Sequence, residues 1–577
     1  MKRIIFILVF SILTQTTFGQ SKKALSLYKS KRFAQAIPHF EKLVNKDPSI
    51  KYQSKLAICY QKTNQLKKAE AIYHQIVQHK HFNSKIMLHY ADVLMGLGQY
   101  EEAKTWYLKY ADENPKDPTA LLKAEACDYV KTIRPYFSKT RFIPIPFNSD
   151  ADDSNPMMYQ GDIYFSSDRK SGFNVLKKKS GWTGRDFMKI YRVSMENDST
   201  FSSPTPLPNK INNLNKNTGK PTFSRDGDFY FTRNTNRVSK DGTYKLHIFY
   251  AHLLPNGTWT KAEELPFCQL SINYLHPTVS EDGRTLYFAS NRHGGEGGMD
   301  LYMSQKNGDR WSIPINIGNT INTPNHEAFP YIHPSGKLFF SSKGHQGFGG
   351  FDVFVSEKNE HGFWQPPVNL GAPINSSGDD IGFYADSLMS LALFSSTRNT
   401  DNDDIFMCHI DTTKDVLPPI DSVSYQKMPL EESDTINLQL TDNQVDSTDT
   451  KARYQKEFEE MGITLMDGDT IFLVAPIYPK EAVEVPPYLA GQLDQLIPAM
   501  YLSNSLNFEI YYFSQETTDI DSIAQLRADK MMDYLVERHI PGHKITATGQ
   551  SLNTTNNSPI FADSKKIVIL VKANADQ

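Results

Sequence analysis

The stretch "GGEGGMDLYMS", residues 294–304, returns in a related form as "FGGFDVFVS", residues 348–356. In both copies glycines precede an Asp, and apolar and aromatic residues typical of a β-strand follow it. Asp300 and Asp352 are 52 residues apart, and Asp404 follows after the same interval. Glycine permits a tight turn with positive φ, and an Asp carboxylate accepts hydrogen bonds from turn amides. We predict that these three Asp residues fix turns; the alternative is that they bind a metal or a ligand.

Strand-like segments on both sides of this phrase repeat with it. "GRTLYFASNR", "GKLFFSSKG" and "SLALFSSTR" precede the three Asp residues, and Trp311 and Trp364 mark matching segments after the first two. Weaker copies stand earlier in the chain, at "GDIYFSSDR" and "GDFYFTRNT". Short strands repeated at such a period are typical of propeller blades, each built from four strands. The five copies therefore predict an all-β, five-bladed propeller, with aromatic residues filling the wedges between blades.

The two ends of this region predict how the ring of blades closes. The fifth copy stops at Asp411 without an outer strand, whereas the region opens with "KTRFIPIPFNSD", residues 139–150, which is similar to that missing strand. A strand near Phe142 would then complete the last blade and remove an exposed sheet edge. The propeller is predicted to span residues 138–411. Its repeats resemble the PD40 or TolB-type propeller, and this resemblance implies a protein-binding module of the cell envelope.

The preceding part of the chain repeats a helical pattern. "KRFAQAIPHFEKLVNKDP", "NQLKKAEAIYHQIVQ" and "GQYEEAKTWYLKYADENP" align on Ala36, Ala69 and Ala103, at steps of 33 and 34 residues. The segments resemble tetratricopeptide repeats, in which a small Ala lets two helices pack closely. We predict an all-α repeat domain over residues 21–135, closed by a capping helix within "TALLKAEACDYVKTI" that presents a polar outer face. The resemblance implies a platform that binds a partner's peptide or helix; the alternative is that the repeats only pack on the next domain.

Three further features concern export, the connection after the propeller and the cysteines. Residues 1–19 place Lys2 and Arg3 before a short apolar run, as in a secretory signal peptide, and no stretch of the chain is long and apolar enough for a transmembrane helix. We therefore expect an exported, periplasmic protein.

Residues 412–450 are rich in acidic residues and are predicted to be an extended linker. The chain has four cysteines without a CxxC spacing, and we expect buried thiols rather than disulfides.

The last part, residues 451–577, alternates strand and helix patterns in the order βαβαββ and predicts an α+β domain. "LRADKMMDYLVERHIPGHKITATGQ" is similar to the C-terminal domain of OmpA, and this resemblance implies peptidoglycan binding by an Asp and by the Arg of an Arg-Ala pair. Arg527 matches that Arg, but Tyr512 stands at the family's Asp position and Ile520 at its Asn position. Asp519 and Asp521 are candidate substitutes for the missing acid. The alternative role for Arg527 is a surface salt bridge.

Composition and motifs exclude several classes of function. A net charge of −3 at pH 7 offers no cationic surface for nucleic acid. The chain has no GxSxG, HExxH, CxxC or P-loop motif, so we expect no enzyme activity, no cofactor and no metal site. The order of domains resembles the PorE-like envelope proteins of Bacteroidota, which implies a periplasmic scaffold at the outer membrane, linked to type IX secretion and gliding, with envelope proteins and peptidoglycan as partners. The alternative is an envelope glycan-binding or glycan-processing protein that uses the propeller as its site.

Overall fold

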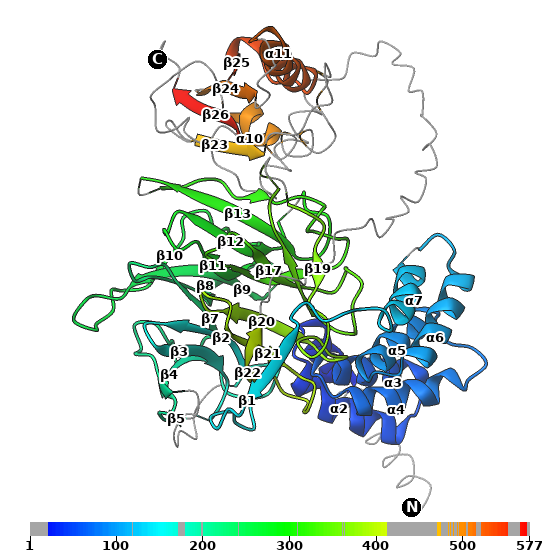
Figure 1. Ribbon diagram of the computed structural model, residues 1–577. Coiled ribbons are helices and arrows are strands. Elements are labelled where there is room, and N and C mark those ends of the chain that lie inside the picture. Colours follow the sequence, from blue (N-terminus) through cyan, green and yellow to red (C-terminus); the bar gives the residue numbers. More distant parts are fainter. Residues whose placement is uncertain are drawn as a thin grey trace, which may run out of the picture.

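The computed structural model describes most of the chain between the predicted leader and the acidic segment. It describes residues 21–411 except 118, 171–178, 198–199, 241, 293, 309, 360–361 and 363, and then residues 470–474, 483, 485, 489, 493, 496–503, 506–514, 521–551 and 566–573. The predicted signal peptide and the predicted linker at 412–450 lie outside the described residues. Figure 1 shows the helical repeats in blue beside the large β region.

The helical part is a stack of antiparallel helices. Residues 21–29 are helical, and they are followed by α2 (Phe33–Lys46), α3 (Ile50–Lys62), α4 (Leu66–Val77), α5 (Lys85–Gly96), α6 (Tyr100–Glu113) and α7 (Thr119–Tyr129). Ala36, Ala69 and Ala103 are all 0% exposed, because each lies where two helices pack closely. The predicted helical repeats are thus present in the fold. The polar outer face predicted for the capping helix α7 is present only in part: Glu125 and Asp128 are exposed, but Leu121 and Leu122 are also 47% and 51% exposed.

The β region consists of five separate antiparallel sheets, which are the five blades predicted from the sequence repeats. The first two blades contain β2 (Asp153–Tyr159), β3 (Asp162–Ser167), β4 (Lys189–Asn197), β5 (Thr200–Phe201) and β6 (Thr205–Pro206), and then β7 (Thr218–Phe223), β8 (Asp228–Val238), β9 (Tyr244–His252) and β10 (Glu263–Glu264). The third contains β11 (Tyr274–Val279), β12 (Thr285–Ser290), β13 (Asp300–Asn307), β14 (Arg310–Trp311) and β15 (Ile315–Asn316). The last two contain β16 (Glu327–Ile332), β17 (Leu338–Ser342), β18 (Asp352–Ser356) and β19 (Val368–Asn369), and then β20 (Asp380–Ala385), β21 (Leu391–Ser396), β22 (Asp404–Asp411) and β1 (Lys139–Ile143).

The blades form a closed ring. Each innermost strand contacts the innermost strand of the next blade, and β20 of the fifth blade contacts β2 of the first. Aromatic side chains fill the wedges: Phe339 of the fourth blade stacks on Phe383 of the fifth with ring centroids 4.7 Å apart. The ring is sealed by β1, which pairs antiparallel with β22 from Lys139 opposite Asp411 to Ile143 opposite Met407. The strand predicted near Phe142 therefore completes the last blade, as expected.

An asparagine just outside the third strand of each blade holds that strand in place. Asn148 accepts a hydrogen bond from Ile405 N–H at 3.0 Å and donates to Ile405 C=O at 2.9 Å. The amide side chain thus imitates one residue of a neighbouring strand. The equivalent residues are Asn212, Asn273, Asn322 and Asn375, of which Asn273 makes only the accepting bond. Because Asn148 precedes the first blade in sequence but serves the fifth, it is a second element of the ring closure.

The periodic Asp residues do bind turn groups. Asp300 accepts hydrogen bonds from the amides of Glu296 and Gly297, and Asp352 accepts them from those of Phe348 and Gly349. Asp404 accepts a hydrogen bond from the Thr400 hydroxyl instead. The predicted turn-fixing role is confirmed for the first two Asp residues.

The predicted reason for the neighbouring glycines is wrong in most positions, because in this phrase only Gly294 has a positive φ. A Cβ on Gly295 would lie 1.8 Å from the Asp300 carboxylate, and one on Gly347 would lie 2.2 Å from that of Asp352. A Cβ on Gly349 would lie 2.0 Å from a backbone oxygen of the adjoining loop. The glycines are therefore needed for close approach of neighbouring groups rather than for an unusual backbone angle.

The C-terminal part is a four-stranded sheet with helices packed on it. Its elements are β23 (Thr470–Val474), α10 (Ile497–Leu502), β24 (Leu506–Ser514), α11 (Asp521–Glu537), the 3-10 turn η1 (Gly542–Lys544), β25 (Ile545–Ser551) and β26 (Lys566–Ala573). The strand order is β23-β26-β24-β25, with β24 parallel to β25 and antiparallel to β26. The predicted apolar face of the first helix is buried in this core: Leu489, Leu493, Leu496, Ile497 and Met500. The predicted βαβαββ order is confirmed.

All four cysteines have free thiols. Cys59, Cys127 and Cys408 are buried, as expected, whereas Cys268 is half-buried. Burial raises the pKa of Cys127 to about 11 and that of Cys59 to about 12, so these thiols stay protonated at neutral pH.

Candidate functional site

The helical repeats dock on the propeller through the turns between their helices. Trp182, in the loop between β3 and β4, lies edge-on to Phe33 with ring centroids 4.9 Å apart and donates its indole N–H to Lys62 C=O at 3.1 Å. Its own carbonyl accepts a hydrogen bond from Ala34 N–H at 3.1 Å. Asn64, in the next helical turn, donates to Asp401 C=O of the fifth blade at 3.0 Å. The alternative in which the repeats pack on the next domain is therefore true of these turns. The turn before α6 is also close to the propeller, because a Cβ on Gly98 would lie 3.6 Å from the Ser377 hydroxyl.

A cluster of carboxylates lies beside this junction. Asp152 and Asp168 both pair with Arg185, at 2.5 Å and 3.1 Å, and Asp403 N–H donates to Asp152. Asn402 accepts a hydrogen bond from the same guanidinium at 2.7 Å. The cluster joins the first blade to the fifth, because residues of both blades share one arginine. It also fixes the loop that carries Trp182, since Arg185 is three residues away.

The carboxylates of this cluster resist ionisation. Burial, reinforced by the charge of Asp152, raises the pKa of Asp168 to about 7. Burial likewise raises the pKa of Asp152. Burial, followed by the negative charge of Asp152, raises the pKa of Asp403 well above its ordinary value. Groups with shifted pKa values mark functional sites in many proteins, but ion-pair networks shift them too. Here the carboxylates of Asp152 and Asp168 each contact Arg185 and a backbone amide of the cluster, so the geometry favours a structural junction.

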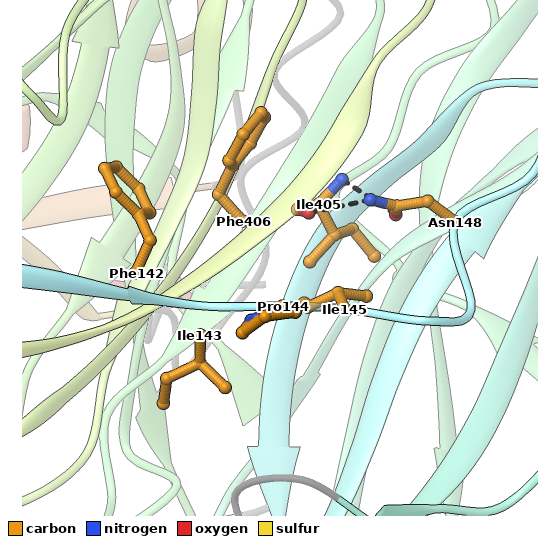
Figure 2. A pocket seen from close by; sticks show the side chains of 7 residues that line it. All are labelled: Phe142, Ile143, Pro144, Ile145, Asn148, Ile405 and Phe406. Carbon is orange, nitrogen blue, oxygen red and sulfur yellow. Dashed lines mark hydrogen bonds between the residues drawn. The ribbon is translucent and has the colours of Figure 1, made fainter.

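The pocket in Figure 2 lies where β1 seals the ring. Its volume is about 250 Å³, and its lining is apolar apart from one amide: Phe142, Ile143, Pro144, Ile145, Asn148, Ile405 and Phe406. Figure 2 shows the amide of Asn148 directed at the Ile405 backbone, so that group is already bonded. The lining has no titratable side chain. This pocket therefore offers a hydrophobic recess but no group for acid–base or nucleophilic chemistry.

Exposed leucines gather on the last two helices of the repeats. Leu108 of α6 is 45% exposed, and Leu121 and Leu122 of α7 are exposed to a similar degree. The two helices pack against each other along their length, with Lys104 paired to Asp128 at 2.6 Å. Exposed apolar side chains at the end of a helical stack are a common feature of protein-binding surfaces.

The residues predicted to bind peptidoglycan are placed only in part by the structure. Arg527 of α11 is 1% exposed and donates to the Tyr512 hydroxyl at 3.4 Å, so these two residues meet as the sequence alignment suggested. The surface role considered for Arg527 is wrong, because the side chain is buried under the sheet. Asp519 and Ile520 lie outside the described residues. Asp521 begins α11, and the direction of its side chain is not described.

Within the described part of the chain, no three metal-binding side chains gather closely enough to hold an ion. The helices described there include none with the length and hydropathy needed to cross a bilayer. Sequence reasoning missed the Arg185 cluster, because its carboxylates come from blades at opposite ends of the propeller sequence. It also missed the five asparagines, although each directly follows a Phe or an Ile before or between the blades and that signal was available.

Comparisons with known proteins identify one segment clearly. Solved structures that resemble parts of the chain include an α-L-arabinofuranosidase from Lactobacillus brevis (13% identity, TM-score 0.32, covering 46% of this chain and 92% of that one) and a thermostable family-43 glycoside hydrolase (14%, 0.30, 47% and 93%). A MotB-like protein from Desulfovibrio vulgaris covers 22% of this chain and 94% of its own, with 20% identity and a TM-score of 0.16. No curated protein matches the chain. A family model, described as tetratricopeptide repeat, matches residues 84–117, which comprise α5, α6 and the turn that follows, and this match indicates protein partners.

Proposed function

We propose that this chain is a non-enzymatic, exported scaffold that holds two protein-binding modules in a fixed relation. The observation that carries the proposal is the junction at Trp182, which ties the helical turns to the propeller while the leucines of α6 and α7 remain exposed. Three exposed leucines on the last two helices suit a contact with a partner protein. The repeats are then free to bind a partner at their outer end.

The finer identity of the scaffold rests on the sequence resemblances. We propose that the chain works in the periplasm at the outer membrane, as a PorE-like component of a type IX secretion or gliding machine. The C-terminal part, in this proposal, is an OmpA-like domain that contacts the cell wall. Its βαβαββ order and the buried Arg527 support this, while Tyr512 at the position of the family's Asp argues for weak peptidoglycan binding.

The partner surface is tested by replacing Leu121 and Leu122 together with Ser. Covering a leucine by a partner contributes about 1.5–3 kcal/mol, so the double variant is expected to weaken partner capture from envelope extracts at least about tenfold. Leu388→Ser is the matched control, because Leu388 is 79% exposed on a propeller turn. Capture that is equally strong from wild type, double variant and control would rule out this surface.

The second candidate function is a glycan-binding or glycan-processing propeller, and the observation that favours it is the raised pKa of the Asp152 and Asp168 carboxyl groups. Glycoside hydrolysis needs two carboxylates on opposite sides of the bond that breaks. Asp152 and Asp168 instead share one guanidinium beside the helical repeats. We therefore expect no turnover with a panel of glycan and peptide substrates. Turnover that disappears in Asp168→Asn would establish the enzyme and reject the scaffold.

A further inference from the structure

The innermost strand of every blade carries a bulge at the same position. The antiparallel register shifts between Ser154 and Met157 in the first blade and between Gly219 and Thr222 in the second, and the other three blades show the same shift. At each bulge one residue has a positive φ, between 49° and 62°. These five residues, called the axial ring below, are Asn155, Lys220, His276, Phe329 and Gly382.

Members of the axial ring approach one another around the propeller axis. His276 stacks on Phe329 with ring centroids 3.7 Å apart, and a Cβ on Gly382 would lie 2.9 Å from the Cα of Asn155. The charge of Lys220 helps to lower the pKa of His276, after burial as the main cause. Residues of neighbouring blades that are remote in sequence are thus brought together at the centre.

Hydroxyl groups of the preceding blade hold this ring in place. Asn155 N–H donates to Ser395, and Lys220 N–H donates to Ser166 at 2.8 Å. In the fourth blade the acceptor is a histidine rather than a hydroxyl. Phe329 N–H donates a hydrogen bond to Nδ1 of His276, from the third blade, at 3.4 Å. The neutral imidazole therefore carries its proton on Nε2 and presents a second donor near Lys220.

Lys220 differs from Arg169 and Arg398, two half-buried cations of the propeller that have acidic partners. Arg169 and Arg398 pair with Asp153 and Asp380 at 2.5 Å and 2.7 Å. Lys220 is only 5% exposed, yet among the described residues its ammonium has no hydrogen-bond acceptor or carboxylate partner. Burial alone lowers the pKa of its ammonium to about 8, so the group is mostly charged at neutral pH. A buried charge without a counter-charge is costly, and proteins normally pair it.

We propose that the axial ring is a binding site for a small carboxylate, with Lys220 as the counter-charge. The carboxylate has two oxygens in one plane, which can accept hydrogen bonds from the Lys220 ammonium and from His276 Nε2–H. Asn155 adds a buried side-chain oxygen that lacks a hydrogen-bond donor, and it suits a hydroxyl or amide group next to the carboxylate. The stacked rings of His276 and Phe329 form an apolar wall. This site is independent of the scaffold function proposed above.

The test measures thermal unfolding of the full-length protein in sodium acetate against sodium chloride of equal ionic strength. A ligand that binds only the folded state raises the unfolding temperature in a saturable manner. We expect this rise for the wild type and for Lys240→Met, an exposed lysine of the same blade that serves as the matched control. We expect Lys220→Met to need at least about tenfold more acetate for the same response. Saturation-transfer NMR on the acetate methyl group measures the same binding without reference to stability.

Two further arms, with N-acetylaspartate amide and with phosphate in place of acetate, define the ligand. N-acetylaspartate amide imitates an Asp side chain of a partner protein, so a response to it and to acetate assigns the site to a partner's carboxylate, whereas a response to acetate alone assigns it to a free acid. If Lys220→Met does not fold, Lys220→Gln replaces it in every arm. The proposal is overturned by three results: no saturable response of the wild type to acetate, equal responses of wild type and Lys220 variant, or a Lys220-dependent response to phosphate with none to acetate.

Discussion

At the scale of single residues, buried charges distinguish structural from functional positions in this chain. Arg169 and Arg398 are each matched by an acidic residue of the same blade, so their role in the fold is clear. Lys220 is a buried cation, but among the described residues no acidic side chain lies at hydrogen-bond distance from its ammonium. A buried charge without a counter-charge costs folding free energy.

The unpaired ammonium of Lys220 predicts a pH dependence of stability. The pKa of Lys220 is about 8 in the folded state and about 10.4 in the unfolded state, so the unfolded state binds more protons between these values and stability rises with pH across that window. In chloride buffer, Lys220→Met is expected to be more stable than wild type at neutral pH, by about 3 kcal/mol at most. The difference in unfolding temperature between the two proteins is expected to shrink as the pH rises from 8 to above 10. A difference that stays constant would contradict the burial of a charged ammonium.

Tyr512 predicts the strength of cell-wall binding. Its hydroxyl occupies the space beside the buried guanidinium of Arg527, where the OmpA resemblance places an acid. We expect weak co-sedimentation of the full-length protein with peptidoglycan, and stronger co-sedimentation of Tyr512→Asp, because a carboxylate there can form a charge-assisted pair. Tyr512→Asn, which has the same shape without the charge, is the control and is expected to remain weak. Strong binding by the wild type would place the wall contact elsewhere.

At the scale of elements, one strand and one asparagine close the propeller. β1 supplies the outer strand of the fifth blade, and Asn148 bonds both backbone groups of Ile405 beyond the end of that strand. β1 itself has one unpaired edge. Exposed Lys139 and Arg141 on this strand, and Pro144 directly after it, disfavour pairing of that edge with another chain. The closure therefore removes an edge that would otherwise invite pairing with another chain.

The closure is tested by Asn148→Ala. The variant leaves Ile405 N–H and C=O without partners, which costs about 1–3 kcal/mol for each buried group. In Asn148→Ala, hydrogen exchange of the Ile405 amide is expected to accelerate. In a protein that lacks residues 138–148, exchange throughout β22 is expected to accelerate more than it does in Asn148→Ala. Asn215→Ala, a change at an exposed asparagine before the second blade, is the control and is expected to leave β22 unchanged. Unaltered exchange in the deletion protein would disprove the role of β1.

At the scale of the whole molecule, separate modules are tied by a few contacts. Trp182 and Asn64 join the helical repeats to the propeller, and Ile313 at the outer edge of the third blade packs against the core of the C-terminal part. These junctions use loops and turns, so each module keeps its own core. A scaffold that presents several binding surfaces in a fixed order needs an arrangement of this kind.

The junction is tested by Trp182→Ala, which removes the contact with Phe33 and the hydrogen bond to Lys62 C=O. Amide exchange in α2 and in the turn after α3 is expected to increase, while exchange in the propeller core stays the same, because the blades pack without the helices. Tyr244→Ala is the matched aromatic control, since Tyr244 is 58% exposed on another hairpin. Unchanged exchange in the helices would mean that Trp182 does not hold the modules together.

The sequence by itself determined the local elements of this protein. The repeat at 52 residues predicted the blades, because each blade needs the same alternation of apolar residues and the same turns. The Ala series predicted helix pairs, because only a small side chain fits where two helices cross. The absence of an outer strand after Asp411 predicted that β1 pairs with β22, because a closed ring requires one more strand in the fifth blade.

Only the tertiary structure decided what these elements bring together. The periodic glycines are explained by carboxylates and loops that approach them in space, which a backbone argument from sequence cannot show. The Arg185 cluster and the axial ring combine residues from different blades, and their chemistry depends on burial and distance rather than on spacing along the chain. Nothing in the sequence distinguishes Lys220 from the other lysines. It becomes a candidate binding residue because the closed propeller buries its charge without a partner among the described residues.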